Sequence, residues 1–61
     1  MTHEILEKVY SLILKNIDFS TIELNLMQYK DLKKELGWTD DKTSFLNLTL
    51  IIKEVSTIYV K

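Results

Sequence analysis

The sequence lacks cysteine, proline and arginine, and its 61 residues include one glycine, one histidine and one tryptophan. Without cysteine, and with a single histidine, neither disulfides nor a zinc site built from those ligands can stabilise the chain. A domain this small buries only about 60% of the surface that its unfolded chain exposes, so its stability must come from close helix packing and from association. We therefore expect a single domain over residues 1–61 that forms a homodimer.

Several classes of function are disfavoured by what is missing. Eight lysines face nine acidic residues, which gives a net charge of −1, whereas strong binding to a phosphate backbone relies on a basic surface. Arginine, the commonest specific contact to guanine, is absent. His3 is near a terminus that tends to fray, and there is no glycine-rich phosphate loop or His-Glu metal motif. We expect no enzyme activity, no cofactor and no metal.

The location of the protein is suggested by two further absences. No apolar run is long enough to span a bilayer, and no signal peptide pattern is present. We expect a cytoplasmic protein of a bacterial host cell, without membrane contact. The many Lys, Ile, Asn and Leu residues are typical of AT-rich coding sources such as phages and mobile elements.

The first half of the chain contains a helix, a short strand and a second helix. Residues 3–17 have helical periodicity, with an apolar arc wide enough to face two neighbours. Residues 20–26 alternate between apolar and polar side chains, which predicts a short half-buried strand. Asn25 and Gln28 form a capping-box pair, so a second helix is predicted to begin there. Gly37 supplies the left-handed residue that ends it.

A third periodic segment begins at Thr39, a good N-cap, and helical spacing continues through residues 39–55. Residues 56–60 are β-branched and aromatic, so they fit a strand as well as a helix. As a strand they could pair with residues 21–25. The predicted fold is mainly α, a helix-turn-helix-like three-helix domain with a possible two-stranded ribbon, which leaves an α+β fold open. A plain three-helix bundle is the runner-up.

The order of these segments matches a known pattern of helix, strand, helix, turn, recognition helix and strand. The matching stretches are IEL (22–24), DLKKELGW (31–38), TDDKTSFLNLTLIIKEV (39–55) and STIYV (56–60). With its Leu-Gly-aromatic-Thr turn, this part of the chain resembles the winged-helix branch of the helix-turn-helix families. The chain departs from that pattern because it has no complete wing hairpin and because two aspartates open the recognition helix.

The resemblance implies a DNA-binding surface. In such families the second helix crosses the backbone and the recognition helix enters the major groove. By this resemblance the phosphate contacts are Lys30, Lys33 and Lys34, and the base contacts are Lys42, Ser44 and Asn47. Asp40 and Asp41 would lie close to the phosphates and repel them. A small dimeric DNA-binding transcriptional regulator is therefore the second hypothesis.

The first hypothesis is a protein contact. On a helix, Leu46 and Leu50 would be neighbours beside Trp38, and such exposed apolar patches often bind proteins. Each residue also has a structural role open to it: the leucines and Trp38 can complete the core, and Asp40 and Asp41 can complement a helix N-terminus. We favour a non-enzymatic phage or mobile-element modulator that binds and blocks a host or partner protein, such as a basic nucleic-acid-handling one, through these five residues.

Overall fold

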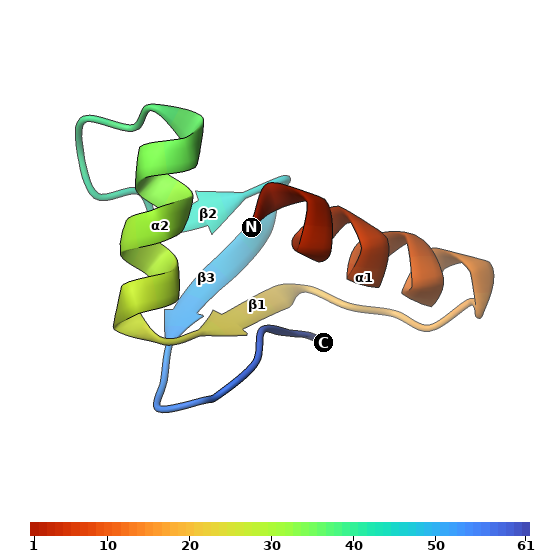
Figure 1. The fold of residues 1–61 in the computed structure, drawn as a ribbon. Helices are drawn as coiled ribbons and strands as arrows, with labels where there is room; N and C mark the ends of the chain where they lie inside the picture. The colour runs from red at the N-terminus through yellow and green to blue at the C-terminus, as the bar shows by residue number, and fades with distance from the viewer.

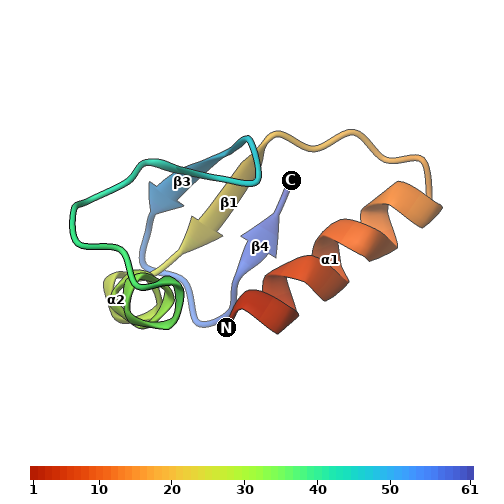
Figure 2. The same cartoon turned by 90° about the horizontal axis from the view of Figure 1, so that it is seen from above.

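Two helices and four strands make up the fold in a computed structural model, which describes residues 1–61 (Figure 1). The elements are α1 (Thr2–Leu14), β1 (Thr21–Leu24), α2 (Leu26–Leu36), β2 (Ser44–Phe45), β3 (Leu48–Ile52) and β4 (Tyr59–Val60). The strands form one mixed sheet in the order β2-β3-β1-β4. β1 and β3 are parallel, and the other two neighbouring pairs are antiparallel. Both helices lie on the same side of the sheet (Figure 2), so the fold is α+β.

The prediction of a three-helix domain is wrong, and so is the runner-up three-helix bundle. Residues 39–55, predicted as the third helix, form a loop and the β2–β3 hairpin. Leu46 and Asn47 have φ values of 54° and 63°, which a right-handed helix excludes and a two-residue hairpin turn of type I′ requires. Thr39 therefore caps no helix.

Pairing with β1 explains why the helical periodicity of this segment was misleading. β3 lies against β1 in parallel, with Ile22 opposite Leu50. Its burial alternates, because Leu48 and Leu50 are buried while Thr49 between them is exposed. Ile51 on the other face is apolar too, so apolar residues occur on both faces of the strand and fit a helical arc by coincidence.

β1 lies at the centre of the sheet because β4 covers its other edge. Ile22 lies opposite Val60 and Glu23 opposite Tyr59 in an antiparallel pair. Pairing between the two segments 21–25 and 56–60 is therefore present, but inside a four-stranded sheet rather than as a separate ribbon. Ile58, just before β4, is fully buried.

α2 begins and ends as predicted. The Asn25 side chain accepts a hydrogen bond from the Gln28 backbone N–H, and the Gln28 side chain accepts one from the Asn25 N–H, both at 2.8 Å. Gly37 is left-handed with φ 69°, and the Trp38 N–H donates to the carbonyl of Lys33 at 2.9 Å. This bond closes a Schellman motif, which satisfies carbonyls at the helix end.

α1 is shorter than the predicted helix over residues 3–17. Asn16 has a φ of 58°, and the Ile17 N–H donates to the carbonyl of Leu12 at 3.0 Å. This is the same end motif with asparagine in the left-handed position. The helix therefore stops at Leu14 and Ile17 folds back beside its last turn.

One apolar core joins the sheet to both helices. Its eight buried side chains are Ile5, Ile22, Leu24, Tyr29, Leu32, Leu48, Leu50 and Ile58. Trp38 packs at its edge and meets Phe45 edge-on, with the ring centroids 6.1 Å apart.

Glu23 is the one buried charged residue. Because its neighbours Ile22 and Leu24 belong to the core, the Glu23 side chain points to the opposite face of the sheet. Its carboxylate is paired with the Nζ atoms of Lys53 at 2.9 Å and Lys61 at 3.2 Å. The hydrogen bond from Lys53 lowers the pKa of Glu23 more than burial raises it. The carboxylate is thus kept ionised and paired on a face that no helix covers.

Candidate functional site

Metal-ligating side chains do not gather anywhere in the structure, since no three His, Cys, Asp or Glu residues come together. No helix has the length and apolar character that crossing a membrane requires. The features that stand out are two exposed apolar surfaces, one beside α2 and one on α1.

The predicted contact patch of Trp38, Leu46 and Leu50 does not form. Leu46 and Leu50 are not helical neighbours, because Leu46 lies in the hairpin turn and Leu50 points from β3 into the core. Trp38 is half-buried against that core, and only Leu46 remains about half exposed. A partner therefore cannot contact these three residues as one surface.

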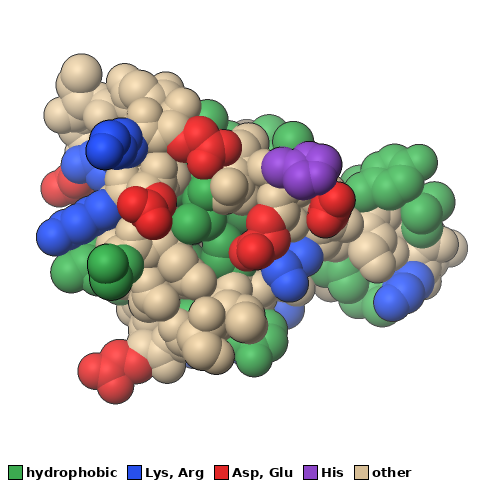
Figure 3. Space-filling model, in the orientation of Figure 1, with side chains coloured by type: hydrophobic (Ala, Val, Ile, Leu, Met, Phe, Trp, Pro, Cys, Tyr) green, Lys and Arg blue, Asp and Glu red, His purple; other side chains and the backbone are tan.

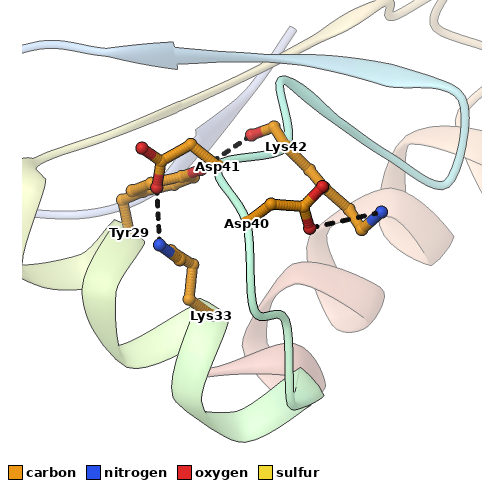
Figure 4. A network of polar contacts seen from close by, with 5 residues as sticks. All are labelled: Tyr29, Lys33, Asp40, Asp41 and Lys42. Atoms are coloured by element: carbon orange, nitrogen blue, oxygen red, sulfur yellow. Dashed lines mark hydrogen bonds and ion pairs between the residues drawn. The ribbon is translucent and has the colours of Figure 1, made fainter.

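The acidic pair lies in the exposed loop between α2 and β2, where lysines balance its charge (Figure 4). Asp41 accepts a hydrogen bond from Lys33, which is the main reason that the pKa of Lys33 is raised. Asp40 is 3.9 Å from Lys42. The Tyr29 hydroxyl donates to the carbonyl of Lys42 at 2.8 Å and so ties the loop to α2. The pair is therefore a local brace for the loop rather than an unbalanced acidic patch.

The predicted DNA contacts are spread over four parts of the chain. Lys30, Lys33 and Lys34 lie on α2, Lys42 belongs to the loop, Ser44 to β2 and Asn47 to the hairpin turn. The recognition helix that would present the last three together is absent, because this part of the chain is a hairpin. The structure thus removes the geometric basis for direct base reading by these residues.

A groove of about 360 Å³ lies between α2 and β3. Tyr29 and Leu50 lie deepest in it, since both are buried, and Leu26 and Ile52 form apolar walls that are 53% and 50% exposed. The sequence does not predict that Leu26 and Ile52 are exposed at the surface. Each fits the apolar periodicity of its segment, so nothing in the sequence distinguishes them from core positions.

Charged side chains from α2 and the loop form the rim of this groove. Lys30, Lys33 and Lys42 are basic, whereas Asp41 is the acidic residue that lines it. Three predicted DNA contacts and two predicted protein contacts, Asp41 and Leu50, are therefore brought together around one apolar groove. Three lysines and one aspartate line the rim. Asp41 is paired with Lys33, so the remaining lysines give the rim a surplus of positive charge.

An open strand edge borders the same groove. β2 pairs with β3 only through Leu48 and Thr49, and the Leu50 N–H donates to the Thr43 carbonyl at 2.8 Å. No strand pairs with β3 beyond this point on that side. Because hydrogen-bonding groups alternate between the two sides of a strand, the Ile52 N–H and the Leu50 carbonyl are directed to this edge. Such an edge is a template for an additional strand.

The second apolar surface runs along α1. Its members are 45–70% exposed and are Leu6, Tyr10, Ile13, Leu14 and, just after the helix, Ile17. All of them except Ile17 line a shallow groove of about 600 Å³, together with His3 and Glu7. Hydrophobic side chains cover the far end of this helix in Figure 3. The wide apolar arc of residues 3–17 was the signal for it in the sequence.

Glu35 fixes the start of α1 against the end of α2. Its carboxylate accepts a hydrogen bond from the Thr2 backbone N–H at 2.9 Å and lies 3.2 Å from the N-terminal ammonium. The Thr2 side chain, the Thr2 backbone N–H and the N-terminal ammonium together lower the pKa of Glu35 to about 2.

The lowered pKa of Glu35 predicts how stability depends on pH. The folded state favours the ionised carboxylate, so its contribution is complete above the ordinary value of 4.5 and is lost as the pH falls toward about 2. Glu35→Gln should therefore reduce the slope of the melting temperature against pH in this acid range. Glu54→Gln, on an exposed residue without an ion pair, is the control. An unchanged slope in Glu35→Gln would contradict this role.

The chain matches no known family model, no characterised protein and no solved structure.

Proposed function

We propose that this protein is a non-enzymatic protein-binding domain whose partner site is the groove between α2 and β3. The observation that supports this best is the half exposure of Leu26 and Ile52 at a concave surface beside an open strand edge. Concave surfaces with apolar walls and a few polar groups are typical binding sites.

The strand edge favours an extended segment of the partner as the ligand. Such a segment would add to β3 through main-chain hydrogen bonds with the Leu50 carbonyl and the Ile52 N–H, and its alternate side chains would enter the groove. A segment bound in this way is unavailable for its other contacts, so binding blocks the partner at that segment.

The rim sets the charge of the preferred ligand. Asp40 and Asp41 are balanced by lysines, so a basic partner finds little surplus negative charge there. Lys30 makes no ion pair in the structure and lies on the groove rim with Lys42. We therefore infer a segment in which acidic residues alternate with apolar ones, rather than a basic partner.

The test uses peptides selected from a random display library against the immobilised protein. The sequences of the selected peptides should alternate between apolar and acidic residues. Leu26→Glu should weaken their binding at least about tenfold, because it removes an apolar wall and repels acidic ligands. It should not disturb the fold, because an acidic residue in the first helical turn complements the helix dipole.

Met27→Glu is the matched control for this test. It places the same charge on the next residue of α2, and Met27 is 77% exposed outside the groove. Equal loss of binding in both variants, or no loss in Leu26→Glu, would contradict the groove as the partner site. Tight duplex DNA binding that weakens steeply with salt in the same samples would favour the DNA-binding regulator instead.

A further inference from the structure

We propose that the exposed face of α1 is covered by the α1 helix of a second copy of this chain, antiparallel to it about a two-fold axis. α1 contributes no residue to the α2–β3 groove, so this dimer contact is independent of the proposed partner site. It would leave both grooves of the dimer open.

α1 extends past the body of the molecule. Its C-terminal half projects beyond the sheet in both ribbon views (Figures 1 and 2), and Ile5 in its second turn is its only buried residue. The accessible surface of 4425 Å² exceeds the roughly 4100 Å² expected for a folded chain of this mass. A helix of 13 residues is marginal on its own in water, so the projecting half needs a covering partner.

The composition of the face favours a second copy of the chain. Its five large side chains are apolar, and Glu4, Lys8 and Lys15 lie on the other side of the helix. His3 and Glu7, which line the same groove, are paired with each other at 2.9 Å. Permanent homodimer contacts are more apolar than contacts that form and dissociate. The α1 face has the apolar composition of a permanent contact, whereas the lysine-bordered groove beside α2 has the more polar composition of a transient one.

The exposed face of α1 is self-complementary about its middle. Leu6, Tyr10 and Ile13 follow one another at intervals of four and three residues, which is the spacing of a helix-pair seam. An antiparallel copy centred between Tyr10 and Ile13 places Tyr10 opposite the partner's Ile13, and the contact occurs twice, as two-fold symmetry requires. Ile17, which follows the helix end at Leu14, extends the exposed face beyond this seam.

The area that such a pair would bury is large enough for a biological interface. With roughly 200 Å² for a fully exposed large apolar side chain, the exposed fractions of the five residues correspond to roughly 570 Å² per chain. A pair would therefore bury roughly 1,100 Å², which passes the approximately 1,000 Å² expected of a biological interface. A membrane surface is a poorer occupant, because α1 carries Glu4 and Glu7 beside its lysines instead of being uniformly basic.

The solution mass tests this proposal. Sedimentation equilibrium of the full chain from about 5 to about 500 µM should give twice the chain mass of 7.2 kDa, with a dissociation constant of tens of micromolar or lower. Ile13→Glu should weaken the dimer at least about 100-fold, because each copy would bury an unpaired carboxylate. Ile13 is 57% exposed in one chain, so the monomer should stay folded, which circular dichroism checks.

Met27→Glu is the control, because it places the same charge on an exposed residue of α2 far from the pair. Its mass should equal that of the parent chain. A monomer at every concentration in the parent chain, or a dimer that Ile13→Glu leaves intact, would overturn the proposal.

Introduced cysteines test the direction of the pair, since the chain has no cysteine of its own. In an equal mixture of Tyr10→Cys and Ile13→Cys chains, mild oxidation should favour the mixed disulfide, because the antiparallel pair brings these two positions together. A parallel pair would instead favour disulfides between identical chains. Predominance of identical-chain disulfides would overturn the antiparallel arrangement.

Discussion

Leu32→Ala should lower the free energy of unfolding by about 2–5 kcal/mol, the usual range for truncating a fully buried leucine. Leu32 has no exposed surface and belongs to the core that joins α2 to β1 and β3. Small domains often have a total stability of only about 5 kcal/mol. The variant should therefore be partly unfolded at ambient temperature. Urea titration followed by circular dichroism, at one fixed protein concentration, measures the change.

Met27→Ala is the matched control for Leu32→Ala, since it truncates a similarly long side chain of the same helix at a 77% exposed position. It should change the free energy of unfolding by less than about 0.5 kcal/mol. Equal effects of the two substitutions would mean that α2 does not pack on the sheet through Leu32.

Ile5→Ala should release α1 from the sheet. Ile5 is the only residue of α1 that is fully buried, and truncating it should cost about 2–5 kcal/mol. α1 should then open more readily than the strands do, because the rest of the core keeps its own contacts. Hydrogen exchange should show protection of the α1 amides falling at least about 30-fold, the factor that corresponds to 2 kcal/mol.

Ile5→Val supplies the comparison, because it removes one methyl group and should cost about 0.5–1.5 kcal/mol. The amides of β1 and β3 serve as internal references in both variants. Loss of protection in β1 and β3 to the same extent as in α1 would contradict separate opening of this helix. Unchanged protection of α1 in Ile5→Ala would contradict its docking through Ile5.

The boundaries of α2 were predictable because they depend on a few adjacent residues. The capping pair of Asn25 and Gln28 and the left-handed Gly37 act within one or two turns, and the structure shows all three in these roles. The end of α1 was harder to predict, since asparagine at residue 16 takes the left-handed position less commonly than glycine does.

The second half of the chain was not predictable from local pattern. Residues 48–52 become a strand because β1, more than twenty residues earlier, offers a parallel edge with Ile22 opposite Leu50. Tertiary pairing of this kind overrides helical spacing. The one local clue is the β-branched content of the segment, which favours a strand.

The candidate site was predictable only in part. The sequence predicts contacts at Asp41, Leu50 and the lysines Lys30, Lys33 and Lys42 for other reasons, and the fold gathers them around the groove. Leu26 was not selected, because exposure of an apolar residue depends on which neighbours the fold provides. The wide arc of the first helix was a usable signal for the α1 face, since a helix that is apolar over more than one stripe needs more than one neighbour.

The central claim is that this protein acts through two separate apolar contacts, a dimer face on α1 and a partner groove between α2 and β3. The most direct test uses isothermal titration calorimetry to measure how tightly the Ile13→Glu variant binds a peptide selected against the parent chain. The affinity is expressed per subunit, so that the monomeric variant can be compared with the parent. We expect the variant to be monomeric and to bind the peptide within about threefold of the parent's affinity, because Ile13 does not line the groove. Loss of peptide binding in a folded Ile13→Glu monomer would show that the two contacts are not separate and would contradict the account.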